Sequence, residues 1–216
     1  MLEERIIVLR KEIIEYATLA ENMIDKSISG LLKKDNALLA EIIGKDEPRA
    51  NDIEIFLDEL CTTMIAQYQP KARDLRAILM ALKMNNDLER VADHAVNISE
   101  SGLFLIERRP VKPLIDIPRM AEISIKMLKD SITSYINEDA ALAHNVCERD
   151  SIVDGLGDKI LRELITIMGA DPTTIECSLH LLIIARNLER IADLSTNICE
   201  DLIFMVEGKI IKHHNV

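Results

Sequence analysis

The chain has 216 residues and a formal net charge of −11; 48% of its residues are hydrophobic, but only 3% are aromatic. This acidic excess argues against nucleic acid as a partner, because phosphate contacts need clustered lysine and arginine. The apolar residues are mostly leucine, isoleucine, alanine and methionine, which favour helices over strands.

Apolar residues recur at helical spacing through three segments of the first half. Asp35 is a suitable N-cap for the second segment. Gly44 and Pro48 interrupt that segment, so we expect a kink or short break there, because proline removes a helix hydrogen bond. The three predicted helices run from Leu2 to about Lys33, from Ala37 to about Tyr68, and from Pro70 to about Glu107.

A proline-rich linker around residues 109–118 precedes three further predicted helices. Gly169 should end the middle one, and Gly208 the last. His213 and His214 then fall in a frayed tail. The three helices run from about Pro118 to Ile136, from Ala140 to about Met168, and from Thr173 to about Glu207.

These elements predict an all-α protein of six helices, arranged as two tandem antiparallel three-helix bundles, residues 1–109 and 114–216. The four cysteines lack CxxC spacing, and the chain starts with a charged, amphipathic run. We therefore expect free, mostly buried thiols and a cytoplasmic protein. The longest uncharged run, 177–185, is too short to span a bilayer.

One stretch of the third helix occurs again 100 positions later, which indicates internal duplication. Its copies are Leu88-Glu89-Arg90-Val91-Ala92-Asp93 with Asn97-Ile98 and Glu100, and Leu188-Glu189-Arg190-Ile191-Ala192-Asp193 with Asn197-Ile198 and Glu200.

Glu89 and Asp93 share a helix face that is apolar at its start, as do Glu189 and Asp193. Like charges four residues apart disfavour an isolated helix by a few tenths of a kcal/mol. A cation could offset this repulsion, and clustered oxygen ligands suit Mg²⁺, Ca²⁺, Mn²⁺ or iron. The alternative is a solvated acidic face on which Arg90 and Arg190 form surface ion pairs.

The middle helices carry further pairs with the same spacing: Glu47 with Asn51, and Asp150 with Asp154. If the middle and third helices of each half are antiparallel, these pairs could face the repeated motif and enclose a metal cluster. They could equally complement the dipole of a helix N-terminus.

Catalytic motifs are missing from the chain. It has no HExxH, Gly-rich phosphate loop or GxSxG, and no histidine lies three residues after a glutamate. His94 is expected at a bundle edge and Cys199 in the core. We therefore predict that the protein is not an enzyme.

The two repeated motifs, together with Gln69-Pro70-Lys71-Ala72-Arg73-Asp74-Leu75-Arg76 before the third helix, resemble the signature of the PhoU family of phosphate transport regulators. The resemblance extends from about Glu12 to Lys209. It implies two three-helix repeats that bind multinuclear metal clusters through E/DxxxD motifs, with iron expected and manganese, magnesium or zinc as alternatives.

The family's ligand motif maps onto eight residues here: Glu89, Asp93, Glu189, Asp193, Glu47, Asn51, Asp150 and Asp154. Because position 51 is an amide and Pro48 interrupts that motif, the second half is expected to hold metal more tightly.

The resemblance also implies a homodimeric negative regulator of the phosphate-starvation response. Its partners would be the ATPase subunit of a phosphate ABC transporter and a membrane sensor histidine kinase, so it would meet the membrane only through them. Two alternatives stay open: a metal store without a signalling partner, and an accessory of a sodium- or metal-coupled phosphate transporter.

Overall fold

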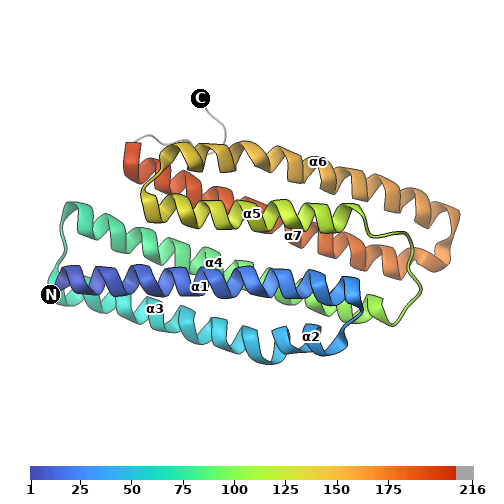
Figure 1. The fold of residues 1–216 in the computed structure, drawn as a ribbon, viewed down its shortest axis with the longest axis horizontal. Coiled ribbons are helices and arrows are strands. Elements are labelled where there is room, and N and C mark those ends of the chain that lie inside the picture. The colour runs from blue at the N-terminus through green and yellow to red at the C-terminus, as the bar shows by residue number, and fades with distance from the viewer. Residues whose placement is uncertain (208–216) are drawn as a thin grey trace.

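The structure is a computed structural model that describes residues 1–207, and nearly all of them lie in helices (Figure 1). The elements are α1 (Leu2–Lys33), α2 (Asn36–Glu41), a π-helical turn (Ile42–Asp46), α3 (Glu47–Tyr68), α4 (Ala72–Ile106), α5 (Asp116–Asn137), α6 (Ala140–Ala170), a 3-10 turn (Pro172–Thr174) and α7 (Ile175–Glu207). The predicted all-α fold of two three-helix repeats is confirmed, with α2, the π turn and α3 forming one bent helix.

Each half folds as three helices that alternate in direction: α1, α3 and α4, then α5, α6 and α7 (Figure 1). The halves pack against each other through α4 and α7 and through α1 and α5. Their buried side chains join into one core cluster. None of the helices within residues 1–207 is long and apolar enough to cross a membrane.

The helix that carries the repeated motif buries the apolar stripe that its sequence predicts. Leu88, Val91, Ala95 and Ile98 are fully buried in α4, and Ala92 is 3% exposed. The stripe fixes the rotation of α4 in the bundle. The carboxylates on the neighbouring face are therefore held at the edge of the core.

Matching caps set the register between the two halves. Asp35 and Asp139 accept hydrogen bonds at 3.0 Å from the backbone N–H of Leu38 and Leu142, which satisfy the first turns of α2 and α6. These caps are 104 positions apart. In the first helices of the two repeats, this register places Met120 where the first half has Tyr16.

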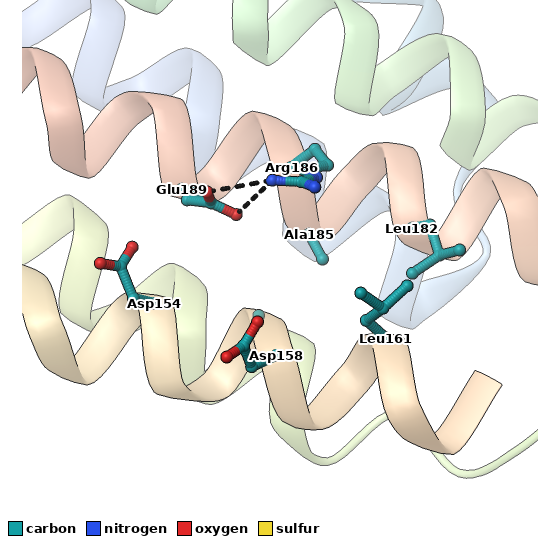
Figure 2. Close-up of a pocket in the computed structure, with 8 residues that line it drawn as sticks. Asp154, Asp158, Leu161, Leu182, Ala185, Arg186 and Glu189 are labelled. Atoms are coloured by element: carbon teal, nitrogen blue, oxygen red, sulfur yellow. Dashed lines mark hydrogen bonds and ion pairs between the residues drawn. The ribbon is translucent and has the colours of Figure 1, made fainter. Parts of the chain in front are cut away.

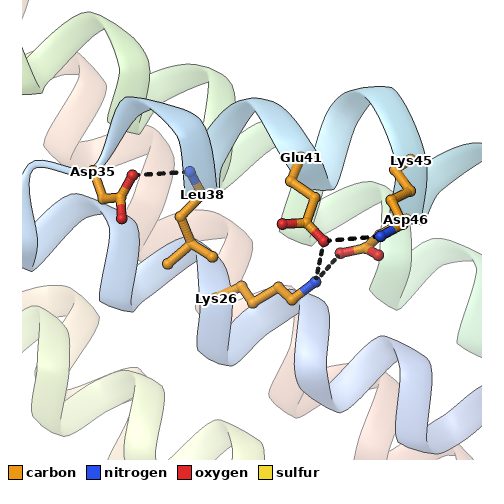
Figure 3. Close-up of polar contacts among 6 residues, drawn as sticks. All are labelled: Lys26, Asp35, Leu38, Glu41, Lys45 and Asp46. Carbon is orange, nitrogen blue, oxygen red and sulfur yellow. Dashed lines mark hydrogen bonds and ion pairs between the residues drawn. The ribbon is translucent and has the colours of Figure 1, made fainter.

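The kink predicted near Gly44 and Pro48 is the π turn Ile42–Asp46, and a π turn takes one residue more than an α-helical turn. The Lys26 Nζ of α1 donates to Asp46 Oδ2 at 2.7 Å and to Glu41 Oε1 at 3.2 Å (Figure 3). The turn is thus tied to α1 at both ends. Beyond it the two halves are 103 positions apart, so Gly157 takes the place of Glu54.

Several predicted boundaries were wrong by two residues. Helix α4 begins at Ala72 instead of Pro70, and α7 at Ile175 instead of Thr173. Helix α6 continues through Gly169 to Ala170. It ends there because Pro172 holds the preceding residue, Asp171, in an extended conformation. Helix α5 begins at Asp116, two residues before Pro118, because proline is tolerated in a first helical turn. The predicted stop at Gly208 and the tail histidines lie outside the described residues.

All four cysteines are free thiols, as predicted; Cys61, Cys177 and Cys199 are buried and Cys147 is half-buried.

Candidate metal centre

The first repeated motif places two carboxylates side by side on α4. Glu89 is half-buried and Asp93 is exposed. Burial raises the pKa of Glu89, and the charges of Asp93 and Glu54 raise it further. The pair therefore carries negative charge that the surrounding protein does not neutralise well.

Two acidic residues of α3, Glu54 and Asp58, contact α4 one turn before this pair. Asn85 of α4 donates through Nδ2 to the backbone oxygen of Glu54 at 2.9 Å and to Asp58 Oδ1 at 3.0 Å. These bonds set α3 against α4 so that Glu54 acts electrostatically on Glu89. The signal was present in the sequence, because Glu54 and Asp58 have the same ExxxD spacing as Glu89 and Asp93.

A tyrosine from α1, the first helix of this half, also belongs to the surroundings of the cluster. Tyr16 of α1 is fully buried, and its hydroxyl has no hydrogen-bond partner within residues 1–207. Burial raises the pKa of Tyr16, and the negative charges of Glu89, Glu54 and Asp93 raise it further. Tyr16 and Glu54 match Met120 and Gly157 of the second half, where Met120 Cε lies 3.6 Å from the place of a Cβ on Gly157, so we infer that the hydroxyl faces Glu54. We refer to Tyr16, Glu54, Asp58, Glu89 and Asp93 as the first-half cluster.

The predicted pair Glu47 and Asn51 lies on α3 at the positions that match Asp150 and Asp154 of α6, and its role as metal ligands stays a prediction. Glu47 is half-buried in the first turn of α3, and Asn51 is exposed. Across the described chain, neither makes a hydrogen bond or ion pair with Glu89 or Asp93. Glu47 continues the bent helix from the π turn and its backbone N–H donates to Ile42 O, so it does not lie at a free helix N-terminus and the dipole interpretation does not apply to it.

In the second half, acids of α6 and α7 line a common cleft of about 270 Å³ (Figure 2). Asp154 and Asp158 come from α6, and Glu189 comes from α7. The structure thus brings the predicted Asp154 and Glu189 together and adds Asp158. Asp150 lies one turn before Asp154 and acts electrostatically on Cys147.

Two arginines of α7 form ion pairs with the carboxylates of the second repeated motif. Arg186 Nη1 lies 3.2 Å from Glu189 Oε1, and Arg190 Nη1 lies 3.0 Å from Asp193 Oδ2. The interpretation as a solvated, ion-paired face therefore fits this half as it stands.

The equivalent positions of the first half lack such arginine pairs. Asn86 takes the place of Arg186, and Arg90 pairs at 3.9 Å with Asp87 instead of Asp93. No lysine or arginine among the described residues forms an ion pair with Glu54, Glu89 or Asp93.

Within residues 1–207, no three histidine, cysteine, aspartate or glutamate side chains are close enough to hold a metal ion as they stand. The first-half cluster nevertheless offers the chemistry that a hard cation requires: carboxylate oxygens from two helices and an unpartnered hydroxyl. Its side chains would have to converge on an ion. Metal binding therefore stays a prediction.

His94 lies between α4 and α7, not at an acidic site. Its Nδ1 is 2.8 Å from Asn187 Oδ1, and burial lowers its pKa. Cys199 is fully buried, as expected for a core thiol.

Tandem three-helix repeats, each with an ExxxD motif on its last helix, define the class of this protein. The family model described as "PhoU domain" matches it twice, over residues 13–102 and 117–202. The chain belongs to the PhoU family.

Relatives in this family match nearly the whole chain. The "Phosphate-specific transport system accessory protein PhoU homolog" of Aquifex aeolicus is 40% identical over 207 residues, which are 96% of this chain and 93% of the relative. The corresponding "homolog 2" of Thermotoga maritima is 32% identical over 212 residues, 98% of this chain and 90% of the relative.

Solved structures agree with the fold. The crystal structure of PhoU from Pseudomonas aeruginosa superposes with a TM-score of 0.93 at 28% identity, covering 97% of this chain and all of that chain. The phosphate transport system regulatory protein PhoU from Streptococcus pneumoniae has a TM-score of 0.89 at 23% identity, with 98% and 100% coverage, which is a likeness of fold alone.

Proposed function

We propose that this protein is a cytoplasmic accessory protein of a phosphate-specific transport system that represses the phosphate-starvation response when phosphate is plentiful. The observation that carries the proposal is the 40% identity to a phosphate transport accessory protein over 96% of the chain. Its direct partners would be the ATPase subunit of the transporter and a sensor histidine kinase. It would act as a homodimer and not as an enzyme.

A reporter experiment tests this role. A bacterium that lacks its own PhoU expresses a phosphate-starvation reporter even in high phosphate if PhoU is the repressor. Supplying this chain should restore repression in high phosphate only, and the chain should co-purify with the transporter ATPase. Repression without the ATPase, or an unchanged reporter together with no ATPase bound, would contradict the proposal.

We further propose that both halves bind a metal cluster, with iron first and manganese, magnesium or zinc as alternatives. In the first half the ligands would be Glu54, Asp58, Glu89 and Asp93. In the second they would be Asp150, Asp154, Glu189 and Asp193, with Asp158 at the edge of the cleft. Such a metal would neutralise the like charges that each motif places four residues apart.

The first half is the stronger metal site in this proposal, which reverses the order expected from Asn51. Two observations support the reversal. Glu54 and Asp58 offer carboxylates in place of the one that Asn51 lacks, and Arg186 and Arg190 already form ion pairs with Glu189 and Asp193. A cation in the second half has to displace those arginines.

Metal analysis of protein purified without chelator tests the order. We expect Asp93→Asn to remove more bound metal than Asp193→Asn. Asn86→Arg, which copies Arg186 of the second half, should also weaken metal binding in the first half. A larger loss from Asp193→Asn would restore the order expected from Asn51. Bound metal combined with a failed reporter experiment would favour the alternative function, a metal store.

A further inference from the structure

Tyr16 carries a buried polar group that the packing of the protein does not explain. Its side chain is fully buried and its hydroxyl has no partner among the described residues. Buried hydroxyls are almost always hydrogen-bonded, because an unsatisfied one costs about 1–3 kcal/mol. Phenylalanine would fill the same space without that cost, so the hydroxyl itself needs a reason.

The second half shows what the same position looks like without a hydroxyl. Met120 stands there, also fully buried. Its Cε lies 3.6 Å from the place that a Cβ on Gly157 would occupy. A methyl group and a glycine thus replace the Tyr16 hydroxyl and the Glu54 carboxylate. The thioether of methionine is a soft ligand that does not suit a hard cation.

We propose that the Tyr16 hydroxyl is an oxygen contact for a hard cation held by Glu54, Glu89 and Asp93, so that the two metal sites of the protein differ in chemistry. Calcium-sized cations take six to eight oxygen ligands, which carboxylates of two helices alone supply with difficulty. The Tyr16 hydroxyl would add a ligand from α1, so that all three helices of the half contact the cation. This inference rests on the metal binding that we propose for the first half.

Terbium provides a probe for this contact. Tb³⁺ is a hard, oxygen-seeking cation, and its emission is excited through a phenol only when the two are close. The chain has no tryptophan and three tyrosines, Tyr16, Tyr68 and Tyr135. The background for the experiment is the full chain with Glu189→Gln and Asp193→Asn, which removes second-half ligands.

In this background we expect Tb³⁺ emission on excitation of tyrosine. Tyr16→Phe should abolish most of it and weaken Tb³⁺ binding about tenfold, the order of effect seen when a supporting group of a metal site is removed. Tyr68→Phe is the matched control, because Tyr68 is 39% exposed at the end of α3. It should change neither the emission nor the affinity.

A stability measurement distinguishes a contact with the cation from a structural role. In metal-free protein, Tyr16→Phe should leave the melting temperature unchanged or raise it, because it removes a hydroxyl with no partner. With Tb³⁺ or Mn²⁺ present, the same variant should melt below the unsubstituted protein. A tyrosine needed only for packing would lower both temperatures.

Three outcomes would overturn the assignment. Emission that persists in Tyr16→Phe would place another tyrosine at the site. Emission lost without any change in affinity would make Tyr16 a neighbour of the cation but not a contact. If the first half of the unsubstituted protein binds neither Tb³⁺ nor Mn²⁺, the metal proposal for that half falls together with the role of Tyr16.

Discussion

The two halves share a fold, but arginines neutralise the acidic motif only in the second half. In the second half, Glu189 and Asp193 each have an arginine on the same helix. In the first half, no lysine or arginine of the described residues pairs with Glu89 or Asp93; burial raises the pKa of Glu89, and the charges of Asp93 and Glu54 raise it further. Duplication therefore preserved the scaffold and the motif, while the residues around the motif diverged into a paired site and an unpaired one.

A second contrast lies where the middle helix meets the first. Lys26 of α1 pairs with Asp46 at 2.7 Å, while at the equivalent positions Asp130 of α5 pairs with Arg149 at 2.6 Å. The signs of the charges are exchanged but the bridge is kept. What the fold requires at this point is a pair of opposite charges, whichever helix carries which sign.

Substitutions in the core should have the largest effect on stability, and they test whether the two halves are structurally equivalent. Leu88 and Leu188 are both fully buried at matching positions. Leu88→Ala and Leu188→Ala should each lower the free energy of unfolding by about 2–5 kcal/mol, through lost burial and a cavity. Urea unfolding followed by circular dichroism measures this. A large cost in one half only would break the structural equivalence.

The next largest effect on stability is expected at the ion pair between Lys26 and Asp46. Lys26→Asp should cost about 1.5–3 kcal/mol, because the Asp46 side chain, at 6% exposure, loses its charged hydrogen-bond donor. Adding Asp46→Arg copies the second half and should recover part of this loss. Thermal unfolding of the single and double variants measures the recovery. A double variant no more stable than Lys26→Asp would show that the π turn demands the original orientation.

The unpaired motif predicts a gain in stability from removing a charge. Glu89→Gln should raise the stability of metal-free protein at pH 7 by a few tenths of a kcal/mol, because it relieves like-charge repulsion. Glu189→Gln should lower stability or leave it unchanged, because it deprives Arg186 of its partner. Melting temperatures of both variants, with chelator present, measure the difference in sign.

The pH dependence of the same variant follows from the raised pKa of Glu89. Folding favours the protonated form, so the contribution of this group is fully present below its ordinary pKa of 4.5 and is lost as the pH rises through the folded value. The advantage of Glu89→Gln should therefore vanish in acid. An advantage that grows on acidification would contradict the raised pKa.

His94 gives the smallest effect, at the interface of the halves. Its pKa is lowered by burial, while Asn187 and Asp93 favour the charged form and Arg90 and Arg190 oppose it. Its contribution is present above its ordinary pKa of 6.5 and is lost as the pH falls through the lower folded value. His94→Leu, which copies Leu194 of the second half, should flatten the stability profile below pH 6.5. An unchanged profile would assign that slope to other groups.

The sequence predicted most of the fold and half of the candidate site. Apolar spacing and caps such as Asp35 are local signals, so six helices could be placed and the break near Pro48 anticipated. The ends at Gly169 and Pro118 were misplaced because a glycine or proline near a helix end does not by itself fix the last or first helical residue. Glu89, Asp93, Glu189 and Asp193 were found because duplication marks them.

The remaining site residues depend on the packing of one helix against another. Glu54 and Tyr16 lie 35 and 73 positions from Glu89 in the chain, and no local pattern indicates which of their faces meet. Beyond the π turn, Glu47 and Asn51 match Asp150 and Asp154 at the 103-residue offset, so the repeat pointed to them, whereas Glu54 and Asp58 have Gly157 and Leu161 as counterparts and no acidic repeat marks them. The sequence by itself thus determined the helices, the repeat and the acidic motif. Only the tertiary structure decided which acids gather and which arginines neutralise them, because antiparallel register and long-range charge contacts are set by the packed core.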